Sequence, residues 1–204
     1  MPVIAIIGAG ALAGALAHKL AGRGRVAEIR LVDPAESVAR GKALDILQSG
    51  PVEGFATKVT AQGSVLAAAG ADVIVLADDA EGNEHAGEAG LALVRQLQAA
   101  GAAAPLVFAG STQRPLMARC VTELHVAPAR LVGSAPVALT SAVRAISAIV
   151  MDVSPVEISL AIAGVPPSHT VVAWEAASIS GRPLRDVMGA HQIAAVSARR
   201  PGLW

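Results

Sequence analysis

The residues whose types and spacing could support chemistry start at Gly8, because the chain reads GAGALAG from there to Gly14. The run follows an apolar, β-branched stretch and precedes a stretch of helical composition, as a phosphate-binding turn between a strand and a helix does. The first glycine permits a tight turn, and the second lets the backbone approach a pyrophosphate. The amides and dipole of a helix N-terminus favour an anion there. We therefore predict that Gly8, Gly10, Ala11 and Leu12 contact a phosphate group.

A carboxylate stands where an adenosine ribose is commonly bound. Asp33 follows the next predicted strand, about 20 residues after the glycines. There it could accept hydrogen bonds from ribose hydroxyls and repel a ribose phosphate, which favours NAD over NADP. Ala77 and Ser111 follow two later predicted strands and complete the predicted cofactor-binding set. The alternative interpretation is a glycine-rich turn kept for packing, with Asp33 as an ordinary turn residue.

The elements that would position these residues alternate between strand and helix over the first two thirds of the chain. We expect strands at 3–7, 28–32, 58–60, 72–77, 106–109 and 130–133. We expect helices at 11–20, 38–49, 65–69, 91–100 and 116–124, with Gly50 and Pro51 ending the second and a polar loop at 78–90. This alternation predicts an α/β fold, a Rossmann doubly wound parallel sheet.

After Gly133 the pattern changes. A helix is expected at 138–150, a pair of antiparallel strands at 157–163 and 170–176, and a last helix at 190–199. The sequence thus predicts an NAD(P)-binding Rossmann domain over residues 1–137. Residues 138–204 are expected to form a small α+β appendage of a helix, a β-hairpin and a tail.

Composition limits the classes of partner. The formal net charge is zero, whereas nucleic acids and anionic membranes attract basic faces. The apolar opening at 2–17 lacks the basic start of a signal peptide and is too short to span a bilayer. Cys120 is the single cysteine, which suits a reducing compartment and a buried thiol. We expect a cytoplasmic protein that binds neither nucleic acid nor membrane.

Two strings resemble a known family. The chain reads GKALDI at 41–46 and GPVEGF at 50–55, which closely resembles the malate and lactate dehydrogenases, bacterial malate dehydrogenases above all. The likeness extends through RLVG at 130–133 and GRPL at 181–184. The resemblance implies the fold of that family, whose members transfer hydride between NADH and a 2-keto acid. A histidine moves the proton, an aspartate orients the histidine, and arginines bind the substrate.

The catalytic positions of that family carry other residues here. By position its histidine falls on Pro166, in GVPPS at 164–168, and its aspartate on Leu139 or Thr140. The carboxylate-binding arginine falls on Ala142 or Val143. The resemblance therefore assigns no catalytic residue, and the second domain resembles a truncated remnant of the family's substrate domain.

Other parts of the site also differ. The mobile-loop arginines fall near Gly82 and Glu88, in an acidic loop, and the family's Asn-Pro pair falls on Ser111 and Thr112. We interpret His85 and the glutamates around it as a solvated loop and predict no metal site. Asp78 and Asp79 replace small residues beside the cofactor, and their charge conflicts with a pyrophosphate. Binding of NAD is therefore left open.

Three functions are compatible with the residues found at the catalytic and cofactor-binding positions of the resembled family. The first is a malate/lactate dehydrogenase-like protein that binds NAD or another adenine nucleotide, has lost the dehydrogenase activity, and acts by binding or regulation. The second is an oxidoreductase for a different small substrate, using Ser111, Thr112 or His169. The third is a structural partner without a ligand. Uncovered apolar edges favour a homo-oligomer in each case.

Overall fold

The chain divides into two compact units, each described by itself below. The computed structural model describes residues 1–165 and 169–199, and the units are Met1–Gly133 and Ser134–Trp204. The division falls after Gly133, whereas the sequence placed it after Val137. The reason is that the helix that opens the second unit begins at Ala135 and includes the residues before Ala138.

The first unit is built on a six-stranded parallel sheet with the order β3-β2-β1-β4-β5-β6. Its strands are β1 Val3–Ile7, β2 Glu28–Val32, β3 Lys58–Gln62, β4 Val73–Leu76, β5 Leu106–Phe108 and β6 Leu131–Gly133. Each neighbouring pair is parallel. This strand order confirms the predicted Rossmann doubly wound sheet. The order reverses between β1 and β4, so the carboxyl ends of these two strands flank the turn that carries Gly8 and Gly10.

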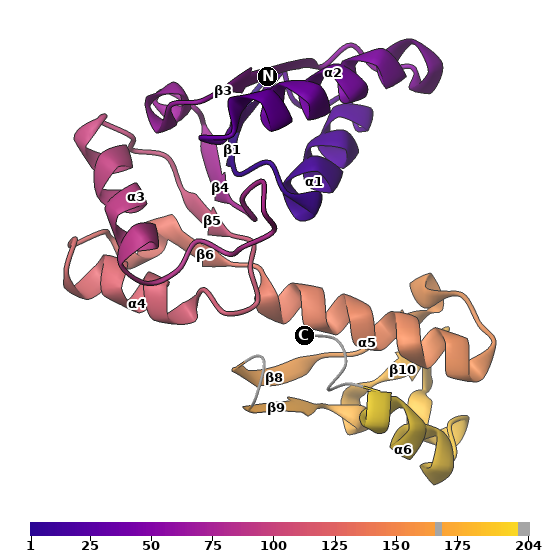
Figure 1. The fold of residues 1–204 in the computed structure, drawn as a ribbon. Coiled ribbons are helices and arrows are strands. Elements are labelled where there is room, and N and C mark those ends of the chain that lie inside the picture. Colours follow the sequence, from indigo (N-terminus) through magenta and orange to yellow (C-terminus); the bar gives the residue numbers. More distant parts are fainter. Residues whose placement is uncertain (166–168, 200–204) are drawn as a thin grey trace. The chain divides into compact units, whose positions relative to one another are not determined.

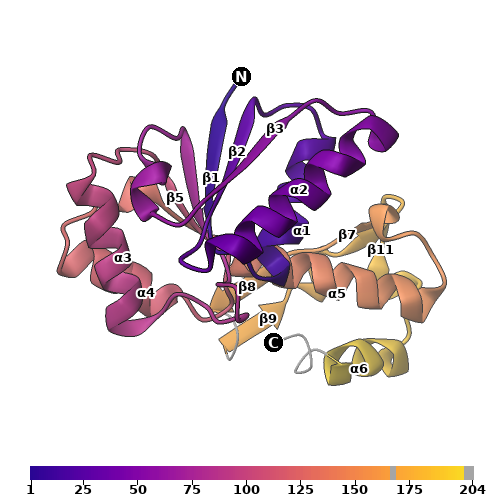
Figure 2. The same ribbon diagram turned by 45° about the horizontal axis from the view of Figure 1, so that its top comes forward.

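Helices cover both faces of this sheet. Helices α1 (Ala11–Gly22) and α2 (Glu36–Glu53) lie on one face, and α3 (Gly87–Ala99) and α4 (Arg114–Thr122) lie on the other (Figures 1 and 2). Short 3-10 segments, η1 Val65–Ala68 and η2 Pro128–Arg130, complete the unit. The buried face of α1 is made of Ala13, Ala17 and Ala21, spaced four residues apart. Such small side chains let α1 lie close against the sheet.

Two helix boundaries in this unit differ from the sequence prediction by four residues each. Helix α2 continues through Pro51 to Glu53, so the expected stop at Gly50 and Pro51 was wrong. Proline removes one N–H donor, but its fixed φ is close to the helical value, so the chain can keep helical dihedral angles through Pro51. The helix ends where Gly54 adopts φ +78° and its N–H donates to the Gly50 carbonyl. Helix α3 begins at Gly87, earlier than expected.

The second unit has a helical and a strand part around its own core. It contains α5 (Ala135–Met151), β7 (Ile158–Ser159), β8 (Ile162–Val165), β9 (His169–Val172), β10 (Ser178–Ile179), β11 (Arg182–Pro183) and α6 (Ala190–Arg199). Three 3-10 segments, η3 Pro155–Glu157, η4 Trp174–Ala176 and η5 Leu184–Asp186, connect them. Strands β8 and β9 pair antiparallel, as expected. The first half of the expected hairpin, however, splits at Leu160, and β7 pairs with β10 in a separate three-stranded sheet.

Cys120 lies on α4 inside the first unit. Its side chain is fully buried, and burial raises the pKa of the thiol. Both observations agree with the predicted role as a small apolar residue. Over the part of the chain that the structure describes, no helix combines the length and apolar character needed to cross a bilayer.

Candidate functional site

The turn between β1 and α1 requires glycine at its first position. Gly8 has φ +122°, and its N–H donates to the Val32 carbonyl at 2.7 Å. A Cβ on Gly8 would lie 2.1 Å from the carbonyl oxygen of Asp78. The same carbonyl accepts the N–H of Gly10 at 3.0 Å. The turn is therefore packed directly against Asp78, the second residue after β4, with no room for a side chain.

The amides at the start of α1 donate to a carboxylate of the chain itself. The N–H of Leu12 donates to Oδ2 of Asp78 at 3.0 Å, and the N–H of Ala13 donates to Oδ1 at 2.8 Å. A Cβ on Gly10 would lie 2.2 Å from Oδ2 of Asp78. The Ala11 and Leu12 side chains themselves are exposed. The anion at this helix N-terminus is thus Asp78, at the place where the sequence predicted a phosphate.

Asp33 is buried, with only 3% of its surface exposed. Its Oδ1 accepts the N–H of Ala35 at 2.8 Å, and its Oδ2 accepts the N–H of Ala80 at 3.0 Å. The carboxylate therefore connects the end of β2 to the loop after β4. Ala77, also in the predicted set, is 1% exposed, and its N–H extends the pairing of β4 by donating to Ile7.

Glu84 accepts hydrogen bonds from the turn after β5. Its Oε1 accepts the N–H and the hydroxyl of Ser111 at 2.7 and 2.9 Å. Its Oε2 accepts the N–H and the hydroxyl of Thr112 at 3.0 and 2.6 Å. Burial raises the pKa of the Glu84 carboxyl, but these hydrogen bonds outweigh burial, and the pKa lies below its ordinary value. Ser111, predicted to contact a cofactor, is thus bonded to a carboxylate.

The lowered pKa of Glu84 makes this contact sensitive to acid. A carboxyl with a depressed folded-state pKa contributes stability in full above its ordinary pKa of 4.5, and this is lost as the pH falls through the folded-state value. We expect the urea midpoint of the Glu84→Gln variant to fall less steeply than that of the wild type as the pH drops below 4.5. Glu81→Gln, at an exposed position of the same loop, is the matched control. Identical slopes for wild type and Glu84→Gln would exclude this contribution.

These contacts bind the acidic loop, residues 78–86, to the sheet at both ends. Asp78 and Glu84 also form an antiparallel bridge across the loop. Asp79 accepts the N–H groups of Glu81 and Asn83 at 2.9 and 2.8 Å, which closes the tip. The prediction of a solvated loop was therefore wrong for its ends, because turn amides on two elements distant in sequence supply donors that local sequence does not reveal.

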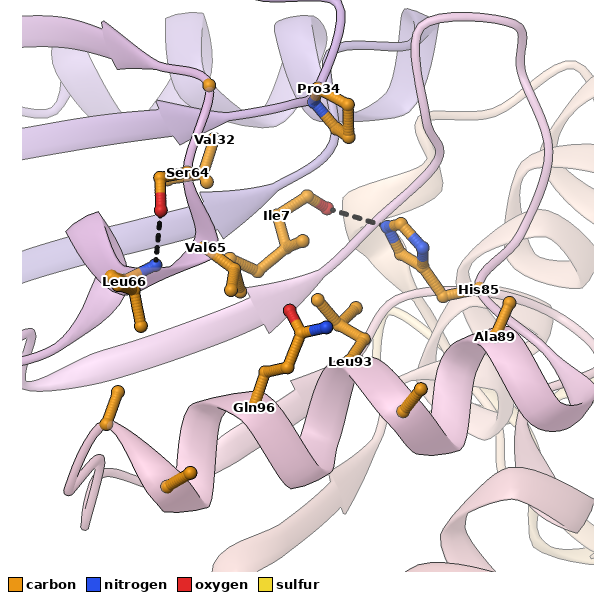
Figure 3. A pocket seen from close by; sticks show the side chains of 14 residues that line it. Ile7, Val32, Pro34, Ser64, Val65, Leu66, His85, Ala89, Leu93 and Gln96 are labelled. Carbon is orange, nitrogen blue, oxygen red and sulfur yellow. Dashed lines mark hydrogen bonds between the residues drawn. The ribbon is translucent and has the colours of Figure 1, made fainter.

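A cavity of about 810 Å³ opens between the sheet and α3 and is lined by Val32 and Pro34, the two residues that flank Asp33 in the sequence. Ile7, Val32 and Pro34 line one side, and residues of η1 and α3 line the other (Figure 3). The polar groups that face it are few: Ser64, His85 and Gln96, with Nε2 of His85 3.4 Å from the Ile7 carbonyl oxygen. An apolar cleft with few polar groups suits a flat, uncharged heteroaromatic ring.

The base and the pyrophosphate of a dinucleotide would meet different surroundings in this site. The apolar cavity suits an adenine base. A pyrophosphate does not fit, because the Leu12 and Ala13 amides already donate to the Asp78 carboxylate. Bound NAD in the family's manner would require the Asp78 side chain to leave these amides.

The positions that correspond to the family's catalytic residues lie in the second unit. Leu139 and Val143 are buried in its apolar core. The Thr140 hydroxyl donates to the Pro136 carbonyl at 2.8 Å. Arg144 donates to the Pro155 carbonyl at 2.9 Å, which agrees with a structural role. Pro166 lies outside the described residues.

Some functional features were foreseen and others were missed. The conflict between Asp78 and a pyrophosphate was expected from position alone, whereas the role of Glu84 was not. Its signal in the sequence was a glutamate in the loop after one strand and two hydroxyl residues after the next. Among the residues that the structure describes, no group of three or more His, Cys, Asp or Glu is placed to hold a metal ion.

The strand order, the glycine turn and the carboxylate after β2 define a dinucleotide-type Rossmann domain. Residues 3–96 match the family model described as lactate/malate dehydrogenase, NAD binding domain. The chain is 32% identical over 206 residues to a malate dehydrogenase of Thermomicrobium roseum, an alignment covering 96% of this chain and 66% of that protein. It is 44% identical over 79 residues to a malate dehydrogenase of a Roseiflexus species, covering 39% of this chain and 25% of that one. The chain belongs to the malate/lactate dehydrogenase family.

Solved structures support the same fold. The malate dehydrogenase of Salinibacter ruber superposes with a TM-score of 0.85 at 20% identity, covering 98% of this chain and 66% of that one. The lactate dehydrogenase of Cryptosporidium parvum superposes with a TM-score of 0.83 at 22% identity, covering 100% and 68%. This chain thus spans about two thirds of the length of the relatives that match it throughout, 66% for the Thermomicrobium protein.

Proposed function

We propose that this protein binds an adenine nucleotide at the carboxyl edge of its six-stranded sheet, acts by binding or regulation, and does not transfer hydride between NADH and a 2-keto acid. In this proposal residues 1–137 bind the nucleotide and residues 138–204 are the remnant of a substrate domain. One observation carries the proposal: the edge offers an apolar cavity lined by Val32 and Pro34, while its turns are bonded to the carboxylates of Asp78 and Glu84. NAD is the first nucleotide to test, because the matched family model is an NAD-binding domain.

The proposed loss of activity follows from the chemistry that hydride transfer needs. Reduction of a 2-keto acid requires a proton donor for the carbonyl oxygen and a cation for the substrate carboxylate. The two candidate positions for the cation are Ala142 and Val143, and Leu139 or Thr140 replaces the carboxylate that orients the donor. A positioned acid–base group is worth about 10²–10⁴ in rate, and loss of the guanidinium adds to this.

Absorbance at 340 nm with NADH and a panel of 2-keto acids and aldehydes tests the loss of activity. We expect rates indistinguishable from those without protein, and an authentic malate dehydrogenase serves as the positive control. Rapid, protein-dependent consumption of NADH with oxaloacetate or pyruvate would refute the proposal. The wavelength is the usual one for the reduced nicotinamide ring.

An oxidoreductase with a different substrate is the second candidate. It would rely on Ser111, Thr112 or His169. The hydroxyls of Ser111 and Thr112 both donate to Glu84, so their protons are already engaged. This argues against their use as acids, and turnover of any aldehyde in the same panel would restore the candidate. A structural protein without a ligand is the third candidate, and the absence of a thermal shift with every adenine nucleotide would favour it.

The cellular compartment and the oligomeric state of the protein also remain predictions. We propose a cytoplasmic protein that forms a homo-oligomer. Exposed apolar side chains on α2, among them Leu44 and Val52, support self-association.

A further inference from the structure

We propose that Asp78 determines the ligand specificity of this site, because its carboxylate is a permanent internal substitute for a phosphate. The site then binds adenine compounds through the base, and its affinity for an uncharged nucleoside such as adenosine exceeds its affinity for nucleotides that carry a pyrophosphate. This inference rests on the proposed nucleotide-binding function and deepens it.

The Asp78 carboxylate makes the contacts of an anion bound at a helix N-terminus. Both carboxylate oxygens of Asp78 accept a backbone N–H at the first turn of α1, from Leu12 at 3.0 Å and from Ala13 at 2.8 Å. Both lengths are those of well-formed N–H···O hydrogen bonds. A helix N-terminus stabilises one such anion, so a second anion finds the donors already used. The negative charge of Asp78 also repels a phosphate brought near it.

The acidic loop keeps this carboxylate in place. The Asp78 carbonyl accepts the N–H of Gly10 at 3.0 Å, so the backbone of Asp78 is bonded to the same turn as its side chain. Two residues further on, the N–H of Ala80 donates to buried Asp33. At its other end the loop is bonded through Glu84 to the turn after β5. Displacing Asp78 would therefore disturb contacts along the whole loop.

The cavity is separate from this contact. Asp78 is not among the residues that line it, and the lining combines apolar side chains with three polar groups, Ser64, His85 and Gln96. A base can enter beside Pro34 without meeting the Asp78 carboxylate. The structure thus combines a neutral binding cavity with an adjoining phosphate site that is filled from within.

Isothermal titration with adenosine, ADP and NAD tests the inference on the wild type, Asp78→Ala, Asp78→Asn and the control Glu81→Gln. In the wild type we expect adenosine to bind at least about tenfold more tightly than NAD. Asp78→Ala should tighten ADP and NAD by about tenfold or more and change adenosine by less than about threefold, because it removes the charge and frees two amides. Asp78→Asn should change affinity in the same direction. Glu81→Gln removes one negative charge from the same loop without touching the turn, and should leave all three affinities unchanged.

The outcomes separate the inference from the function on which it rests. Adenosine binding with no gain in NAD or ADP affinity in either Asp78 variant would overturn the inference alone. Wild-type affinity for NAD equal to or above that for adenosine would also overturn it. No binding of any of the three ligands to any variant would reject the proposed function as well. Circular dichroism of both Asp78 variants verifies that they are folded, and Asp78→Asn retains the shape of the side chain if Asp78→Ala does not fold.

Discussion

Gly8→Ala is expected to lower the free energy of unfolding by about 3 kcal/mol or more, which is a large part of the stability of an ordinary domain. Gly8 has φ +122°, a conformation that residues with a side chain rarely adopt. A Cβ there would also lie 2.1 Å from the Asp78 carbonyl oxygen, a backbone atom that cannot move alone. The thermal midpoint should fall by about 6–12 °C. Differential scanning calorimetry measures both quantities.

Gly24→Ala separates conformational strain from the steric clash. Gly24 has φ +62°, and a Cβ there would meet nothing within 4 Å. This control should cost only about 1–2 kcal/mol, the penalty for a left-handed conformation. Equal losses for Gly8→Ala and Gly24→Ala would mean that the close approach of Asp78 to the turn does not exist.

Asp33→Ala is the second large effect, with an expected loss of about 2 kcal/mol or more in the free energy of unfolding. The substitution leaves the N–H groups of Ala35 and Ala80 without the carboxylate oxygens that accept them at 2.8 and 3.0 Å. The acidic loop, which contributes His85 to the cavity, then loses its contact with the end of β2. Chemical denaturation measures the stability, and titration with adenosine should show a weaker affinity.

Two control variants test the cause of the stability loss in Asp33→Ala. Asp33→Asn keeps one oxygen acceptor and places an amide N–H₂ against the other donor, so its stability should fall between those of the wild type and Asp33→Ala. Asp45→Ala removes an exposed carboxylate on α2 and should change stability by less than about 0.5 kcal/mol. If Asp33→Ala were as stable as Asp45→Ala, the described role of Asp33 would be incorrect.

Most of the first unit could be predicted from the sequence. β-Branched apolar runs such as Val3–Ile7 become buried parallel strands, and their boundaries agree closely with the prediction. The glycines at positions 8 and 10 revealed the turn because the backbone passes so close to Asp78 that only glycine fits. Local sequence suffices where local geometry imposes a residue type.

Features that depend on distant contacts could not be predicted in the same way. Pro51 suggested a helix end, but the capping conformation of Gly54 sets the end of α2. In the second unit, pairing of β7 with β10 divides a stretch that alternates like one strand. Neither the cap nor the pairing leaves a periodic signal near the residues concerned.

The functional site also combines features that local sequence predicts with features that depend on distant contacts. Asp33 was predicted to face a ribose, yet its oxygens accept backbone N–H groups. Its amide partner Ala80 comes from a loop 47 residues away in the chain. Glu84 meets Ser111 across 27 residues in the same manner. Such polar contacts depend on the fold of the loop, which composition alone describes only as acidic and polar.

A crystal structure of the protein grown with saturating NAD would show which anion binds the N–H groups at the start of α1. We expect the Asp78 carboxylate on the amides of Leu12 and Ala13, with ordered ligand density confined to the cavity lined by Val32 and Pro34. A pyrophosphate bonded to those two amides in the wild-type protein, with the side chain of Asp78 turned away, would contradict it.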